Sequence, residues 1–355
     1  MKRAVLVFAF ITVIVIVALR FQSWLVMIKS GFLNDYTNVI ESEFNWYLRN
    51  FNKSYSTSEY NIRLWNFKAS LEEINRLNAL EGATVFGFTK FSDMSKEEFV
   101  ERMLLKPSYV GPCYEKHQVC VDTDGYSNNR TWDSDDDVPS YFDWREKGIV
   151  FPVLNQRLCM GCWAFSIVGV MESMAAKQGI DHQRRSIQEL IDCSYYNDGC
   201  RGGNVYRALD FLCRKSKPVE IVTEEEYPLT LSGEQHCVMP PNPVGRRIKE
   251  FTYQCHVDEE KMVRQVATHG PLVAIVDARN WMNYIGGIIR RSCSAGVSNH
   301  VIQIVGYSKN NTDDIPYFLI RNSFGEDFGD HGYVRIGLHG NVCGIRDQVT
   351  MLDVV

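Results

Sequence analysis

Two cysteines lie three positions apart in the stretch Asn155-Gln-Arg-Leu-Cys159-Met-Gly-Cys162-Trp-Ala-Phe-Ser166. This spacing is typical of a redox-active dithiol, of half a zinc site, or of a nucleophilic cysteine beside a structural one. A zinc site would need a second ligand pair of matching spacing, and Cys193 and Cys200 are not arranged in that way. A redox dithiol would be expected to follow a β-strand, whereas the residues before Cys159 are those of a polar loop. The pattern therefore favours a nucleophile, with the other two sites as alternatives.

A nucleophilic cysteine attacks as its thiolate, so it needs surroundings that lower the pKa of its thiol. Apolar residues at helical spacing predict a buried helix over residues 162–178, with Gly179 as its C-cap. Cys162 would then begin this helix, where the unpaired backbone N–H groups and the helix dipole stabilise an anion. The apolar face consists of Ala164, Val168, Met171 and Ala175.

The partner base is expected to be His300, one of eight histidines. It directly precedes the apolar run Val301–Val305, which is typical of a buried strand. A second apolar run, Tyr317–Ile320, is followed closely by Asn322. The side-chain oxygen of Asn322 would accept a hydrogen bond from one ring nitrogen of His300 and leave the other to face the thiol.

The two halves of the chain differ in their secondary-structure patterns. Residues 40–80 are predicted to be helical, with an apolar stripe that includes Leu71, Ile74 and Leu77. Residues 301–305, 317–320 and 333–336 are short β-type runs separated by glycines. This organisation predicts an α+β fold with two lobes.

The chain resembles the papain and cathepsin family of cysteine peptidases, because Gln156, Cys162, His300 and Asn322 match its four catalytic positions in order and near spacing. The resemblance implies a two-lobed papain-like fold, with a helical lobe and a β-barrel-like lobe, preceded by a helical inhibitory prosegment. It implies hydrolysis of peptide bonds through a thioester, with no cofactor and no metal. The Gln156 amide and the Cys162 backbone N–H would form the oxyanion hole.

The N-terminal third resembles cathepsin-L-like propeptides, and so the chain is expected to be an endopeptidase zymogen. Four parts are expected: a signal peptide or signal anchor over 1–28, the prosegment over 29–105, an exposed linker over 106–137 and the peptidase domain over 138–355. The maturation site is expected near residues 133–138. Acid would protonate prosegment carboxylates such as Asp93 and loosen docking. The matching motif residues are Glu59, Arg63, Phe67, Ile74, Asn78, Gly87, Phe91 and Asp93.

Peptide and protein substrates, and the chain's own prosegment, are the partners that the resemblance implies. Gly202 and Gly203 would let a substrate backbone approach closely. The second substrate pocket would have a mixed lining that suits an aliphatic P2 residue. Its expected residues are Asn204, Val205, Ile275, Ser298 and Gln348.

Several positions depart from the family pattern. Met160 replaces a glycine and is expected to narrow the P1 pocket, and Gly161 replaces a serine. Phe324 and Phe328 stand where the family has tryptophans, of which the first shields the His–Asn hydrogen bond. Ser70 and Thr89 replace asparagines in the prosegment motifs. A homologue that binds partners without hydrolysis, and an exopeptidase, are the alternative functions.

Eleven cysteines favour an oxidising compartment, and their odd number leaves one thiol over. The resemblance implies the pairs Cys159–Cys200, Cys193–Cys237 and Cys293–Cys343. The remaining expectation, Cys113 with Cys120 and Cys213 with Cys255, would leave Cys162 unpaired.

The N-terminus also favours the secretory pathway, towards a lysosome or secretion. Lys2 and Arg3 precede the apolar run Ala4–Leu19, which can be a cleaved signal or a membrane anchor. The formal net charge is −5 and no basic block is present, so no nucleic-acid partner is expected. The protein is expected to be a monomer. Glycosylation sequons begin at Asn52, Asn129 and Asn310.

Overall fold

The structure is a computed structural model that describes residues 38–120, 138–214, 219–234, 236–241, 243–293, 295–310 and 315–355. It divides into two compact units, Met1–Ala69 and Ser70–Val355. Each unit is considered by itself below.

The described part of the first unit consists of a helix over residues 38–50 and the first half of α2 (Thr57–Glu81). Phe67 is fully buried, and its ring lies 5.2 Å from that of Phe44 and 5.0 Å from that of Tyr47. An aromatic cluster therefore joins the two helices. The helical pattern predicted for residues 40–80 is confirmed, with a break between the helices at residues 51–56.

The second unit contains one continuous sheet. Its pairs are antiparallel except for β5 with β8, which is parallel. The three strands predicted over 301–305, 317–320 and 333–336 are confirmed. In spatial order the strands are β1 (Lys116–Val119), β3 (Ile248–Cys255), β9 (Gln348–Val354), β4 (Leu272–Val276), β6 (His300–Ser308), β7 (Tyr317–Arg321), β8 (Tyr333–Gly337) and β5 (Ile288–Ile289), and β2 (Tyr141–Asp143) pairs with β6.

The helix predicted at Cys162 is α5 (Cys162–Lys177), which is buried along nearly its whole length. Gly179 follows it with φ +69°, and the N–H of Ile180 bonds back to the carbonyl of Ala175. This geometry ends the helix as predicted, because glycine adopts a left-handed conformation without strain. The other described helices of this unit are α3 (Lys96–Met103), α4 (Pro107–Val110), α6 (Ile187–Cys193), α7 (Val205–Leu212), α8 (Glu259–Thr268), and short 3₁₀ turns at Gly199–Arg201, Trp281–Asn283 and Val342–Gly344.

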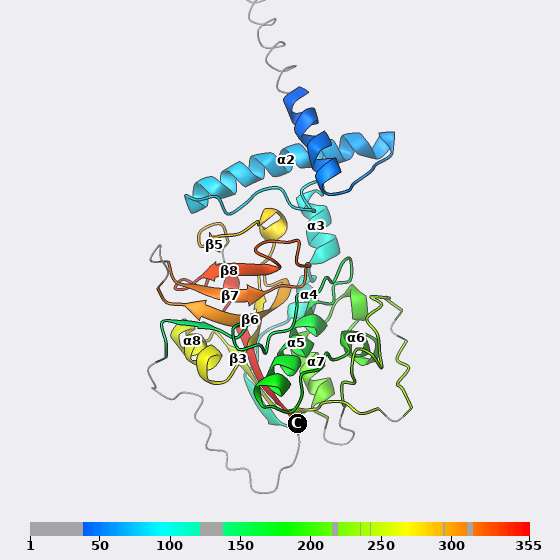
Figure 1. Cartoon of the computed structure of the whole chain (residues 1–355), viewed down its shortest axis with the longest axis vertical. Coiled ribbons are helices and arrows are strands. Elements are labelled where there is room, and N and C mark those ends of the chain that lie inside the picture. Colours follow the sequence, from blue (N-terminus) through cyan, green and yellow to red (C-terminus); the bar gives the residue numbers. More distant parts are fainter. Residues whose placement is uncertain are drawn as a thin grey trace, which may run out of the picture. The chain divides into compact units, whose positions relative to one another are not determined.

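Two hydrophobic cores confirm the two-lobed α+β prediction. One lies around the sheet and includes Trp281, Ile304 and Phe318. The other surrounds α5 and includes Trp163 and Leu209. Figure 1 shows α5, α6 and α7 grouped on one side of this unit, with β6, β7 and β8 on the other.

A polar seam joins α5 to β6 between the two cores. The Gln303 side chain donates to the carbonyl of Gly169 at 3.1 Å and to Oγ of Ser173 at 3.0 Å, and it accepts from Arg321 at 3.0 Å. Cys162 is seven residues before Gly169 on the helix, and His300 is three residues before Gln303 on the strand. The seam therefore sets where the first residues of helix and strand lie.

The linker predicted over residues 106–137 differs from expectation in its first part. Residues 107–110 form α4, and β1 pairs with β3, so that His117 lies opposite Thr252. Residues 121–137, including most of the expected maturation site near 133–138, lie outside the described residues.

Two of the expected disulfides are wrong. Cys113 bonds to Cys255 and Cys120 bonds to Cys213, in place of Cys113 with Cys120 and Cys213 with Cys255. The reason is the pairing of β1 with β3, which holds residues 116–119 extended against the sheet. Cys113 and Cys120 therefore lie at opposite ends of β1, and each bonds to a cysteine 93 or more positions away. The three pairs implied by the resemblance, Cys159–Cys200, Cys193–Cys237 and Cys293–Cys343, are all present.

The sequon asparagines Asn52 and Asn310 are exposed, and Asn129 lies outside the described residues. Among the residues that the structure describes, no helix combines the length and apolarity needed to cross a bilayer. The signal peptide or anchor predicted over residues 1–28 lies outside them.

We predict that Gly169→Ala destabilises the zymogen. A Cβ at residue 169 would lie 2.6 Å from Nη1 of Arg321 and 3.0 Å from Oε1 of Gln303, so the seam would have to separate. We expect a loss of about 1–3 kcal/mol in the free energy of unfolding, although alanine favours a helix over glycine. Thermal unfolding would measure it. Gly233→Ala is the control, because a Cβ there approaches no atom closer than 3.7 Å. An unchanged or higher melting temperature for Gly169→Ala would contradict the seam's role.

Candidate active site

Cys162 is the first residue of α5 and, among the described residues, the free cysteine of the chain. It is fully buried, and this burial raises the pKa of its thiol to about 12. The backbone N–H groups of Val301, Trp163 and Cys162 itself oppose the rise by hydrogen bonding to the sulfur. The contact with Val301 places the sulfur beside the residue that follows His300. The start of α5 therefore lies close to the start of β6.

His300 begins β6 and is held by Asn322, which follows the end of β7. Nε2 of the ring lies 2.7 Å from Oδ1 of Asn322, so Nδ1 is the ring nitrogen left to serve a thiol. Within the described structure, Nδ1 is buried and has no hydrogen-bond partner. The Phe324 ring lies against the imidazole at a centroid distance of 4.7 Å, and Trp281 meets it edge-on at 5.9 Å.

The protonation states of the two groups follow from their burial. Burial lowers the pKa of His300 to about 4, although the bond to Asn322 works in the opposite direction. Because burial also raises the thiol pKa, it penalises both the imidazolium and the thiolate. The pair is therefore neutral while the site is covered.

Gln156 lies beside this pair with its amide fixed. Oε1 accepts a hydrogen bond from Oγ of Ser323 at 2.5 Å, and Nε2 donates to the carbonyl of Cys159 at 3.0 Å. The same Nε2 donates at 3.3 Å to the carbonyl oxygen of Met103, the last residue of α3. A backbone carbonyl from residues N-terminal to the peptidase domain thus occupies the donor that was predicted for the oxyanion hole.

The chain upstream of the peptidase domain covers the site on both sides of this carbonyl. Before it, Phe91 and Phe99 pack their rings against Phe324 at 5.7 and 6.1 Å. After it, the N–H of Leu105 donates to the carbonyl of Asn299 at 2.7 Å. With this chain in place, Cys162 and His300 are both fully buried.

Residues 81–92 dock on the loop before β5. The N–H of Gly87 bonds to the carbonyl of Asn283, and the N–H of Ile285 bonds to the carbonyl of Val85. The buried Glu81 carboxylate accepts from the backbone N–H groups of residues 290, 291 and 292 at 2.8–3.1 Å. Burial disfavours this carboxylate, but these hydrogen bonds outweigh burial and lower its pKa below its usual value. The docked segment therefore relies on a charged Glu81.

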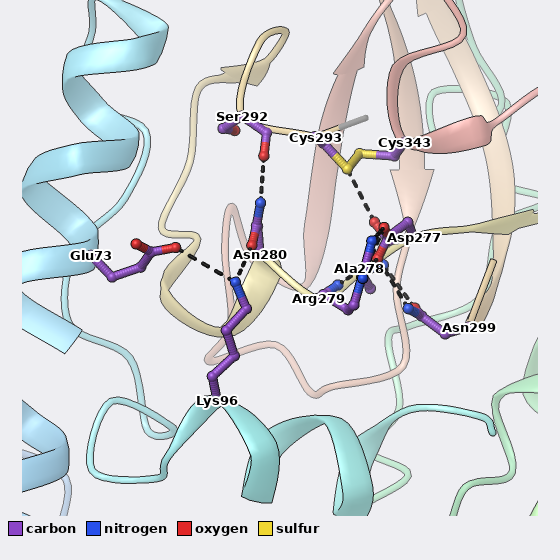
Figure 2. A network of polar contacts seen from close by, with 10 residues as sticks. All are labelled: Glu73, Lys96, Asp277, Ala278, Arg279, Asn280, Ser292, Cys293, Asn299 and Cys343. Carbon is purple, nitrogen blue, oxygen red and sulfur yellow. Dashed lines mark hydrogen bonds and ion pairs between the residues drawn. A yellow bond between two sulfur atoms is a disulfide. The ribbon is translucent and has the colours of Figure 1, made fainter. Parts of the chain in front are cut away.

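Figure 2 shows the polar contacts of Lys96 on α3 and, in the same region, those of Asn299, the neighbour of His300. Lys96 donates to Oδ1 of Asn280 at 2.9 Å, and Nδ2 of Asn280 donates to the carbonyl of Ser292. Asn299 accepts from the N–H of Ala278 at 2.9 Å and donates to Asp277 at 3.0 Å. Because Asn299 directly precedes His300, these bonds hold the backbone at the start of β6. The remaining residues drawn are Glu73, Arg279, Cys293 and Cys343.

Three predicted substrate residues contact residues 109–111 instead of a substrate. The Tyr109 ring lies over Gly202, where a Cβ would come within 2.6 Å of it. Asn204 donates to the carbonyl of Tyr109 at 2.6 Å, and Gln348 donates to that of Gly111 at 3.3 Å. The glycine at 202 also has φ +132°, a conformation that other residues rarely adopt.

The other predicted substrate residues have different surroundings. Gly203 faces the Trp163 ring, and Val205 and Ile275 are buried in the helical-lobe core. Met160 and Ser298 are half-buried, and the N–H of Met160 bonds to the carbonyl of Cys200.

Sequence reasoning missed three residues that shape the site. Tyr109 donates from its hydroxyl to Asp198 at 2.6 Å, Trp281 packs on His300, and Asn299 holds the strand start. Of the three, only Asn299 could have been found from the sequence, because it is the direct neighbour of the predicted base. Tyr109 and Trp281 reach the site only through the fold.

The family models and known proteins agree with this geometry. Residues 138–352 match the papain family cysteine protease model, and residues 44–99 match the cathepsin propeptide inhibitor domain model. Human cathepsin O is 38% identical over 293 residues, which cover 81% of this chain and 87% of that protein. Cysteine proteinase 1 of Dictyostelium discoideum is 32% identical and covers 87% of this chain and 92% of its own length.

Among solved structures, the digestive procathepsin L 3 of Tenebrio molitor larval midgut superimposes with a TM-score of 0.70 and 27% identity. The match covers 88% of this chain and 99% of that one. Nothing in these matches favours a homologue without hydrolytic activity. The chain therefore belongs to the papain family of cysteine proteases and carries the propeptide inhibitor domain that goes with it.

Proposed function

We propose that Cys162 is the nucleophile and His300 the general base of an endopeptidase, with Asn322 orienting the imidazole and Gln156 stabilising the oxyanion. One observation carries the proposal. Cys162, the free thiol among the described residues, begins α5 beside the backbone N–H of Val301. In His300, the residue before Val301, Nε2 is held by Asn322 and Nδ1 has no hydrogen-bond partner in the described structure.

The reaction follows from these positions. Cys162 transfers its proton to Nδ1 of His300, and the thiolate attacks the peptide carbonyl. The Gln156 amide and the Cys162 N–H stabilise the oxyanion, and the imidazolium protonates the leaving amine to give a thioester. His300 then activates water, which releases the acid and restores the thiol.

The prosegment inhibits in two ways. Its Met103 carbonyl takes the Gln156 donor, and its apolar residues bury the catalytic pair and keep it neutral. Removing the segment exposes the pair to water, which lowers the cost of forming the thiolate–imidazolium pair.

A continuous segment passes the catalytic pair from residues 85–92 on one side to residues 109–111 on the other. A site that accepts chain on both sides supports internal cleavage over removal of terminal residues. The proposed P2 site, which suits an aliphatic residue, consists of Asn204, Val205, Ile275, Ser298 and Gln348. Gly202 and Gly203 would pair with the substrate backbone, and Met160 narrows the P1 site. Five disulfides and exposed sequon asparagines support an enzyme of the lysosome or a secreted enzyme.

The function is tested with Cys162→Ser. The activated protein is expected to react with a thiol-directed epoxide and to cleave internal bonds in a peptide library. Cys162→Ser is expected to lose both properties, with turnover lower by roughly 10³-fold or more. Epoxide labelling that persists in Cys162→Ser, or unchanged cleavage, would assign the chemistry elsewhere.

We predict that Gln156→Ala lowers kcat of the mature enzyme by roughly 10²–10³-fold with a small change in KM, because the amide acts on the oxyanion. Steady-state kinetics on a peptide substrate measure this effect. Leu158→Ala, in the same loop but 54% exposed, is the control and should leave kcat unchanged. Equal kcat values for Gln156→Ala and wild type would exclude the assigned role.

We predict that Glu81 makes prosegment release sensitive to acid. Its pKa is lowered in the docked state, so the ionised group stabilises docking fully above its free-state pKa. That stabilisation is lost as pH falls through the lowered value. Glu81→Gln should speed processing roughly tenfold or more at neutral pH and flatten its pH dependence.

The rate of zymogen processing between pH 3 and 7 gives the readout for Glu81. Glu72→Gln on the same helix is the control, because Glu72 is exposed. If Glu81→Gln retains the wild-type pH curve, another group sets the acid response.

A further inference from the structure

We propose that residues Cys113–Cys120 are a permanent part of the peptidase domain, and that the cut which frees the active site lies between Leu105 and Cys113. This inference rests on the zymogen assignment above. It differs from the expectation that the maturation site lies near residues 133–138.

Two disulfides fasten this segment to the peptidase domain. Cys113 bonds to Cys255 at the end of β3, and Cys120 bonds to Cys213 just after α7. One bond lies on each side of β1, so both ends of the strand are covalently held. A peptide cut anywhere outside residues 113–120 cannot release it.

The segment is also integrated by its hydrogen bonds. β1 pairs with β3 over four residues, and the N–H of Cys120 continues the ladder to the carbonyl of Lys249 at 2.8 Å. Lys116 donates to Tyr206 at 3.0 Å and lies 3.3 Å from Asp210, both on α7. β1 is therefore the edge strand of the peptidase sheet, and it covers an edge of β3 that would otherwise be unpaired.

The chain just upstream has the opposite character. Residues 103–111 reach the active site through noncovalent contacts alone in the described structure, with donors on Gln156, Asn204 and Gln348. The change occurs at Gly111-Pro112-Cys113. The noncovalently held residues thus end, and the disulfide-held segment begins, at Cys113, three residues after α4.

A cut within residues 121–137 would leave this arrangement intact. The inhibitory residues would stay joined through Cys113 to the peptidase domain, at an effective concentration in the millimolar range. Release therefore needs a cut upstream of Cys113. Exposed residues are available to a peptidase there, because residues 106–108 and 111–112 are exposed while Val110 is buried.

The retained segment has a consequence for substrate binding. The Gly111 carbonyl accepts from Gln348, whose Oε1 is held by the Tyr253 hydroxyl at 2.6 Å. A cut before Gly111 would place the new N-terminus beside the proposed P2 site. A second cut within 121–137 would give an enzyme of two chains joined by two disulfides.

Mapping the termini of the activated protein tests the proposal. The full zymogen is processed at acidic pH, its free thiols are blocked, and its mass and N-termini are measured before and after reduction. If it does not process itself, an added peptidase is used, so the result does not depend on its own catalysis. We expect an N-terminus between residues 106 and 113, and Cys113 and Cys120 in disulfide linkage with Cys255 and Cys213. A processed enzyme with its first residue within 121–138 and no attached peptide carrying Cys113 would overturn it.

An engineered cut gives a second, independent test. A site for a specific protease replaces residues 126–132 of the zymogen, and activity is followed on dilution after cleavage. With the disulfides intact we expect no gain, whereas a variant with serine at 113, 120, 213 and 255 should gain roughly tenfold or more on dilution. Cys193→Ser with Cys237→Ser is the matched control and should behave as the intact protein. An equal gain in activity in the protein with intact disulfides would contradict the proposal that they tether the inhibitory residues. If the four-serine variant does not fold, the N-termini measured in the first test decide.

Discussion

The buried Gln303 side chain is the contact on which the active-site geometry depends. It joins the carbonyl and hydroxyl of two α5 residues to the guanidinium of Arg321 on the neighbouring strand. A buried amide left without these partners would cost roughly 1–3 kcal/mol, so helix and strand have one favourable relative position. From that position, the N-terminus of α5 and the start of β6 bring Cys162 and His300 to one point. Gly169 makes the close approach possible because a side chain there would meet Arg321.

The prosegment uses the same apolar packing that builds the domain core. Phe91, Phe99 and Met103 belong to one continuous cluster with the sheet residues around Phe324. Cys162 and His300 are buried beside this cluster, and their burial disfavours both the thiolate and the imidazolium. The same burial therefore blocks access to the two side chains and disfavours their charged forms. Polar anchors at Glu81 and Lys96 set the register of the covering chain.

Much of the fold could be predicted because its signals are local. The helix at Cys162 follows from a continuous apolar pattern and a terminal glycine, and the strand at His300 follows from a β-branched run. The linker could not be predicted in this way. Its prolines, glycines and acidic residues are typical of exposed loops, yet β1 pairs with a strand more than 130 positions later. Local composition carries no information about such a partner. The sequence therefore could not predict that Cys113 pairs with Cys255 and Cys120 with Cys213.

The sequence by itself determined which residues could carry the proposed chemistry: one cysteine at a helix start, a histidine at a strand start, and an asparagine and a glutamine at matching positions. These are properties of residue type and short-range pattern, and residue type sets which atoms can attack, accept a proton or donate a hydrogen bond. Only the tertiary structure decided which carbonyl accepts from the Gln156 amide, which carboxylate anchors the prosegment and which cysteines pair with Cys113 and Cys120. Those outcomes depend on contacts between distant segments, whose free energies arise from burial and pairing that exist only once the chain has folded.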